Sequence, residues 1–178
     1  LPAGSVPATA GGLFVATAGG EALIFGGRPA GGPSSPTANL WRYSHGFTRV
    51  GPGPGRPGPR AFAGFAIDGV RALLFGGERA GEPLGDGWTL DGGGVWTQLP
   101  AAGAPAARTG PALAWDAERG QAVLFGGRGA ADLLADTWIW DGAWRQAAPV
   151  HSPVARERAA IAWDPARRRV VLFGGRAA

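Results

Sequence analysis

Arginine is the residue type with which this chain could most readily do chemistry. All 17 of its basic residues are arginines, and the net charge is +4. A planar guanidinium binds a carboxylate, phosphate or sulfate through two parallel hydrogen bonds. The arginines that recur at matching places, and that are predicted to form a ligand-binding face, are Arg28, Arg60, Arg108, Arg128, Arg158 and Arg176. The sequence therefore predicts one Arg-rich face that suits an anionic ligand.

A structural role competes with ligand binding at three of these positions. Arg60, Arg108 and Arg158 each stand just before an apolar run. A repeated arginine at such a place can bond loop carbonyls or an acid of the neighbouring unit, because buried polar groups need partners. We favour this structural interpretation for the three arginines, and ligand binding stays open as the alternative.

Catalytic and metal-binding groups are sparse in the rest of the sequence. The two histidines, His45 and His151, are predicted to lie on opposite faces, so that they cannot readily share a metal ion. Each stands next to a serine, but sequence neighbours do not aim a hydroxyl at an imidazole. The absence of cysteine excludes disulfides, thiol nucleophiles and thiolate metal ligands. We expect no catalytic residues, no metal site and no cofactor.

The elements that must position these residues follow from an internal repeat. The tripeptide Phe-Gly-Gly begins at Phe25, Phe75, Phe125 and Phe173, a period of about 50 residues. Each unit holds short apolar or alternating runs separated by Gly, Asp or Pro, which is the pattern of strands and turns. Asp-Gly pairs, as at Asp91 and Asp141, are hairpin signals because glycine adopts positive φ without a steric penalty. We expect four antiparallel strands per unit and almost no helix.

The repeat resembles kelch repeats of the bacterial form. An apolar strand precedes each Phe-Gly-Gly, a tryptophan follows, and a second tryptophan opens the last strand, as in residues 138–144. The resemblance covers essentially the whole chain and implies an all-β propeller of four-stranded antiparallel blades. It divides the single array 1–178 into units 8–50, 58–99, 106–148 and 156–176, the last being half a blade. The chain is thus expected to hold about three and a half blades.

An array of this length is not expected to close by itself, because propellers typically have about 4–8 blades. Residues 1–7 match residues 99–105, and residues 174–178 stand midway through a unit. An open array would expose a blade face and strand edges. We therefore expect closure through a second copy, as in a homodimer, or through missing blades of a longer chain.

The leading functional hypothesis is a non-enzymatic scaffold whose loops bind a protein or an acidic glycan. One alternative is a carbohydrate-active enzyme, a lyase or mutarotase on acidic sugars, whose arginines would bind the substrate carboxylate. Such an enzyme would need a general base on the same face, for which the candidates are Glu78, Glu82, Asp132 and His151. A further alternative is a purely structural repeat that assembles with itself.

Composition restricts the other partner classes. No apolar stretch approaches the roughly 20 residues that a membrane-spanning helix requires. Nucleic acid is disfavoured because Tyr43 is the only tyrosine and the tryptophans are expected in the core, which leaves few stacking platforms. The compartment stays open, with secretion or the cell surface slightly favoured.

Overall fold

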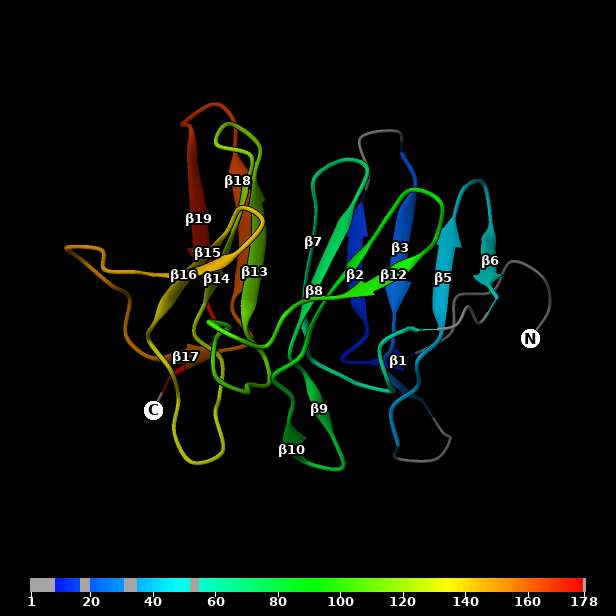
Figure 1. Ribbon diagram of the computed structural model, residues 1–178, viewed down its shortest axis with the longest axis horizontal. Coiled ribbons are helices and arrows are strands. Elements are labelled where there is room, and N and C mark those ends of the chain that lie inside the picture. Colours follow the sequence, from blue (N-terminus) through cyan, green and yellow to red (C-terminus); the bar gives the residue numbers. More distant parts are fainter. Residues whose placement is uncertain (1–8, 17–19, 31–34, 52–54, 178) are drawn as a thin grey trace.

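The protein is built from β-strands. The computed structural model describes residues 9–16, 20–30, 35–51 and 55–177, and no helix occurs among them. The expectation of an all-β chain is confirmed. The strands form antiparallel sheets that stand side by side, with the connecting loops at their upper and lower ends (Figure 1).

Three of the sheets have four strands each, taken in sequence order from one repeat unit. The first comprises β2 (Leu13–Ala16), β3 (Ala22–Phe25), β5 (Leu40–Tyr43) and β6 (Phe47–Val50). The second comprises β7 (Gly64–Ile67), β8 (Ala72–Phe75), β11 (Gly87–Leu90) and β12 (Trp96–Gln98). The third comprises β13 (Ala112–Asp116), β14 (Gln121–Phe125), β15 (Thr137–Trp140) and β16 (Trp144–Ala147).

The fourth unit contributes a two-stranded sheet, β18 (Ala160–Asp164) with β19 (Arg169–Phe173). Three short ladders lie at the lower ends of the sheets in Figure 1. They are β1 (Thr9–Ala10) with β4 (Arg28–Pro29), β9 (Glu78–Arg79) with β10 (Glu82–Pro83), and β17 (Arg156–Glu157) with β20 (Arg176–Ala177).

Neighbouring sheets pack through their faces, and their first strands β2, β7, β13 and β18 adjoin one another in that order. The phenylalanine of one Phe-Gly-Gly packs on the tryptophan that opens the last strand of the next sheet. The ring centroids are 5.3 Å apart for Phe25 and Trp96, and 5.1 Å apart for Phe75 and Trp144. Aromatic pairs of this kind bury large areas, so the repeated sequence positions build the core between sheets.

A buried arginine forms a joint within the second unit. Arg60 donates two hydrogen bonds to the carboxylate of Asp86, at 2.8 and 2.7 Å, and Trp88 donates its indole N–H to the same carboxylate. Burial raises the pKa of Asp86, but the hydrogen bonds from Arg60 and Trp88 outweigh it and hold this pKa below its ordinary value. The Arg60 pair therefore ties the start of the second unit to the third strand of its own sheet.

The same joint recurs one unit later. Arg108 donates to Asp136 at 2.7 and 2.8 Å, and Trp138 donates to that carboxylate at 2.7 Å. Asp136 also has a pKa below its ordinary value, because the bonds from Arg108 and Trp138 outweigh the effect of burial. Arg108 is 1% exposed and Arg60 is 2% exposed. These two arginines hold the fold together, as the structural interpretation predicts.

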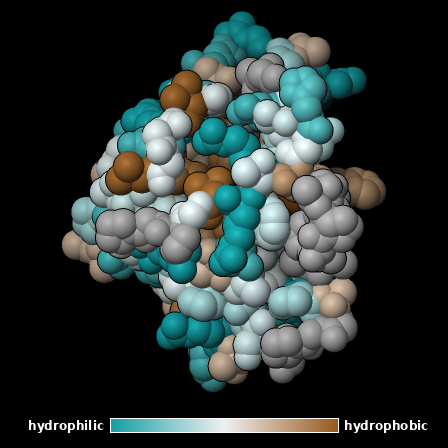
Figure 2. Space-filling view, turned by 90° about the vertical axis from the view of Figure 1, so that its right-hand side faces the viewer, coloured by the Kyte–Doolittle hydropathy of each residue, from teal (hydrophilic) through white to brown (hydrophobic). Residues whose placement is uncertain are grey.

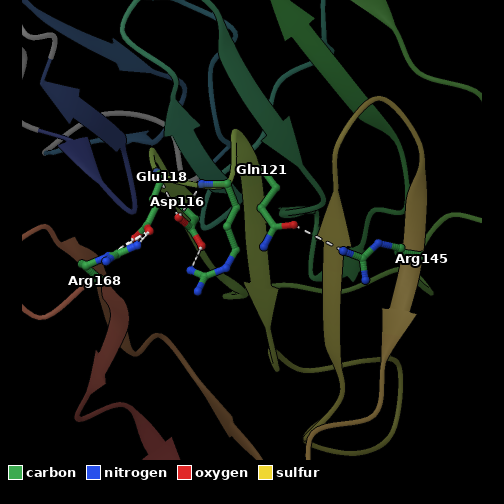
Figure 3. A network of polar contacts seen from close by, with 6 residues as sticks. Asp116, Glu118, Gln121, Arg145 and Arg168 are labelled. Atoms are coloured by element: carbon green, nitrogen blue, oxygen red, sulfur yellow. Dashed lines mark hydrogen bonds and ion pairs between the residues drawn. The ribbon is translucent and has the colours of Figure 1, made fainter.

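The opposite ends of the sheets carry hairpin turns held by aspartates. Asp68, Asp116 and Asp164 each accept backbone N–H bonds from their own turn. Figure 3 shows Arg168, from the β18–β19 turn, donating to Glu118 of the β13–β14 turn, with Nε–O distances of 2.8 and 2.9 Å. The bonds from Arg168 lower the pKa of the exposed Glu118.

The outer surface mixes polar and apolar groups. Figure 2 shows the side of the molecule near β5 and β6, where hydrophobic residues occur in separate spots among hydrophilic ones. No helix of the described residues is long and apolar enough to cross a membrane.

Candidate functional site

Four residues in left-handed backbone conformation form an arc, part of a ring, of consecutive turns where the first strands of neighbouring units begin. They are Gly11, Phe62, Gly110 and Arg158, with φ between 55° and 67°. Each residue after Gly11 donates its backbone N–H to the carbonyl of the ring residue before it, at 2.9, 2.7 and 2.7 Å. We call these four residues the turn ring. It links neighbouring units by main-chain bonds and fixes the positions of two side chains.

Those two side chains lie against each other. The guanidinium carbon of Arg158 lies 3.9 Å from the centroid of the Phe62 ring. The other two positions of the turn ring require glycine. A Cβ at Gly11 would lie 2.5 Å from the aromatic ring of Phe62, and a Cβ at Gly110 would lie 2.9 Å from the Arg158 side chain. A left-handed conformation costs a residue other than glycine roughly 1–2 kcal/mol. Phe62 and Arg158 are thus held in a strained but well-defined arrangement.

Two buried glutamates lie among the arginines close to the turn ring. Glu78 is 5% exposed; it forms an ion pair with Arg28 and accepts a bond from the Thr109 hydroxyl at 3.3 Å. The guanidinium carbon of Arg28 is 5.7 Å from the centroid of the Phe62 ring. Glu78 therefore has a charge partner, and the Nε atom of Arg28 is buried without a hydrogen-bond partner.

Glu157 has three arginine neighbours and no close hydrogen bond to them. Its carboxylate lies 3.7 Å from Nε of Arg128, 3.9 Å from Nε of Arg158 and 3.9 Å from Nε of Arg176. Glu157 is 3% exposed, and its Oε2 atom and the Nε atom of Arg128 are buried without partners. A buried polar atom without a partner costs about 1–3 kcal/mol, so this arrangement is electrostatically favourable but incompletely satisfied.

We call Arg28, Arg128, Arg158 and Arg176 the arginine cluster. Its four positive charges exceed the two negative charges of Glu78 and Glu157. Beside the cluster, the turn ring lines a cavity of about 310 Å³ together with Leu13, Ala63 and Pro111. Three of the four guanidiniums are substantially exposed, with side-chain exposures of 43% for Arg128, 49% for Arg158 and 79% for Arg176. The arrangement can attract and bind an anion.

The structure separates the six arginines proposed from the sequence into two groups. Arg60 and Arg108 are buried in ion pairs with aspartates and do not line the cavity. The other four arginines form the arginine cluster. Arg158 belongs to the arginine cluster because its guanidinium stacks on Phe62. This role differs from the structural role that its position in the sequence suggested.

The four residues considered as a general base are not brought together. Glu78 is buried and ion-paired, whereas Glu82, Asp132 and His151 are exposed. Among the described residues no group of three or more His, Cys, Asp or Glu is placed to hold a metal ion. His45 and His151 are both exposed.

Sequence reasoning missed Phe62, Thr109 and Glu157. Backbone pairing places Ala61, Thr109 and Glu157 at equivalent positions, because they pair with Glu78, Arg128 and Arg176. A glutamate between two arginines, at residues 156–158, was the available signal. The partners of Glu157 are far apart in sequence, so their proximity follows only from the fold.

No protein-family model matches the chain, and no curated protein matches it in sequence. Among solved structures, that of YjhT is similar to this chain, with a TM-score of 0.77 at 16% sequence identity. The match covers 98% of this chain and 64% of the YjhT chain. The chain thus spans less than two thirds of the YjhT chain, and at this identity the likeness concerns the fold alone.

Proposed function

We propose that the chain is a segment of a kelch-like β-propeller, with three four-stranded blades and half of a fourth. The support is the Phe-Gly-Gly repeat, the three antiparallel four-stranded sheets in sequence order, and the similarity to the YjhT structure. The contacts between the first strands of neighbouring sheets fit innermost strands around a common axis. The turn ring and the arginine cluster would then lie around one end of that axis.

We propose that this end binds an acidic glycan, and that the protein acts by binding rather than by catalysis. The observation that carries this proposal is the excess of guanidiniums over carboxylates around Glu157, with buried atoms of Glu157 and Arg128 left without partners. None of the hydrogen bonds among the described side chains uses the guanidinium of Arg158, so its N–H groups are available to donate to a ligand carboxylate. The adjoining cavity offers room for a sugar ring.

Calorimetric titration with a trigalacturonate, and with the neutral methyl ester of the same oligosaccharide, tests the proposal. We expect the charged sugar to bind and its affinity to fall as salt is raised, because partly exposed ion pairs are screened. Arg158→Ala should weaken binding by about tenfold or more, which corresponds to the loss of one charge-assisted pair. Arg167→Ala is the matched control, because Arg167 lies in a hairpin turn and pairs with Asp164. Equal binding of the charged and neutral sugars would refute the proposal.

A further inference from the structure

A second cavity lies between the first and second units, at the end of the sheets where the turn ring lies. Its volume is about 500 Å³, against about 310 Å³ for the cavity beside the turn ring. We call it the loop cavity and the other the turn-ring cavity. The residues that line the loop cavity include Arg28, Ser35, Pro36, Pro59, Arg79 and Ala80.

Arg28 borders both cavities. It lines the loop cavity, and its guanidinium carbon lies 5.7 Å from the centroid of the Phe62 ring, which lines the turn-ring cavity. The guanidinium carbon of Arg158 lies 3.9 Å from the same centroid. Glu78 engages one nitrogen of Arg28, whereas the Nε atom of Arg28 is buried without a partner. The two cavities are therefore neighbouring parts of one surface, and they share a cation.

Arg79 supplies a second positive charge to the loop cavity. It is exposed, and its side chain makes no hydrogen bond or ion pair with the described residues. Glu82 stands opposite Arg79 in the β9–β10 ladder without forming an ion pair with it. The repeat does not call for an arginine at this place, four residues after the phenylalanine of Phe-Gly-Gly, because the equivalent residues are Pro29, Gly129 and Ala177. A guanidinium that the fold leaves unused is available to bind an anion.

The remaining walls of the loop cavity suit a sugar ring. Pro36, Pro59 and Ala80 contribute apolar groups, and a proline holds its own backbone rigidly. The hydroxyl of the exposed Ser35 can donate to one sugar hydroxyl and accept from another. Since the loop cavity is larger than the turn-ring cavity, a sugar that fits the second also fits the first.

We propose that the acidic glycan binds as an oligomer, with one acidic sugar in the turn-ring cavity at Arg158 and another in the loop cavity between Arg28 and Arg79. This inference rests on the proposed function and adds the length of the ligand to it. The ligand is an oligosaccharide with carboxylates on at least two of its sugars, such as a polyuronate. Linking the two sugars raises the affinity, because the second binds at a high effective concentration once the first is in place.

Calorimetric titration with galacturonate and with trigalacturonate tests the loop cavity. We expect the trimer to bind about tenfold or more tightly than the monomer, and Arg79→Ala to weaken the trimer by about that factor, because one charge-assisted pair is lost. The monomer reports on the turn-ring cavity, so Arg158→Ala should weaken both ligands. Arg71→Ala is the matched control: it removes the same charge from the same unit, but Arg71 is 61% exposed in a hairpin turn and pairs with Asp68.

Salt dependence gives a second readout on the unmutated protein. Raising the salt concentration should weaken the trimer more steeply than the monomer, because two partly exposed charge pairs are screened instead of one. Parallel salt profiles of the two ligands would contradict the span across two cavities.

The outcomes separate this inference from the proposed function. Equal affinities of monomer and trimer, or equal effects of Arg79→Ala and Arg71→Ala on the trimer, would overturn the second binding position and leave carboxylate binding at Arg158 intact. A trimer that needs Arg79 but not Arg158 would refute the proposed function and the span, and would assign binding to the loop cavity alone. Binding of neither sugar would overturn both proposals.

Discussion

The guanidinium of Arg158 lies over the ring of Phe62, 3.9 Å from its centroid, and both residues have left-handed backbone conformation. The two residues belong to different repeat units and are separated by Gly110, whose lack of a side chain lets Arg158 approach. Backbone strain at a residue other than glycine often marks a functional position. This stacked pair is the most specific feature of the candidate site.

Replacing Arg158 by glycine should separate binding from stability. Glycine relieves roughly 1–2 kcal/mol of left-handed strain, and the loss of a partly exposed cation–π contact costs about 0.5–1 kcal/mol. We expect the free energy of unfolding, measured in urea, to change by less than about 1 kcal/mol. Binding of trigalacturonate should weaken about tenfold or more, as for Arg158→Ala. Loss of both stability and binding would show that Arg158 mainly holds the fold.

Arg108→Ala should destabilise the protein strongly. Arg108 is 1% exposed. Removing its guanidinium leaves the carboxylate of Asp136 and the carbonyls of Ala106 and Gly126 without the donor that they bond in the folded protein. Breaking a buried pair from one side costs about 3–5 kcal/mol. The control is Arg145→Ala, whose pairing with Asp141 is exposed on both sides and is worth at most about 1 kcal/mol. Similar urea midpoints for the two variants would contradict the structural role of Arg108.

Gly126→Ala should cost more than Gly174→Ala, although the two glycines are equivalent in the repeat. Both have positive φ, so each alanine carries roughly 1–2 kcal/mol of strain. A Cβ at Gly126 would also lie 2.6 Å from the Arg156 carbonyl and 3.0 Å from that of Leu134. The added crowding brings the expected cost to about 2–5 kcal/mol. Thermal melts that show equal losses would disprove the difference in packing.

Stability should fall on the acid side because of Asp86 and Asp136. Both have a pKa below the ordinary value in the folded chain. A depressed folded pKa adds stability above the unfolded value of about 3.9, and this stability is lost as the pH falls through the folded pKa. Urea midpoints should therefore decline from about pH 5 downwards. In the double variant Asp86→Asn with Asp136→Asn, this part of the decline should disappear; an unchanged pH profile would assign it to other groups.

The amino-acid sequence by itself determined the class of the protein and its repeating unit. An apolar run that ends in Phe-Gly-Gly favours a strand followed by backbone of positive φ, and alternating runs around Asp-Gly pairs favour hairpins. These signals are local, because each depends on residues a few positions apart. The strands and the turns could be predicted for that reason. The expectation of tryptophans in the core is confirmed for Trp88 and Trp96, whereas the other tryptophans are only half-buried.

Only the tertiary structure decided what each arginine does. Arg108 and Arg156 stand at equivalent places in the repeat, yet one is buried against an aspartate and the other has no acid partner among the described residues. The neighbours of Glu157 come from three separate segments, and Phe62 meets Arg158 from another unit. Burial and charge pairing depend on which surfaces pack together. A repeat fixes which residues are equivalent, but the partners that each one finds are set by the neighbouring sheets.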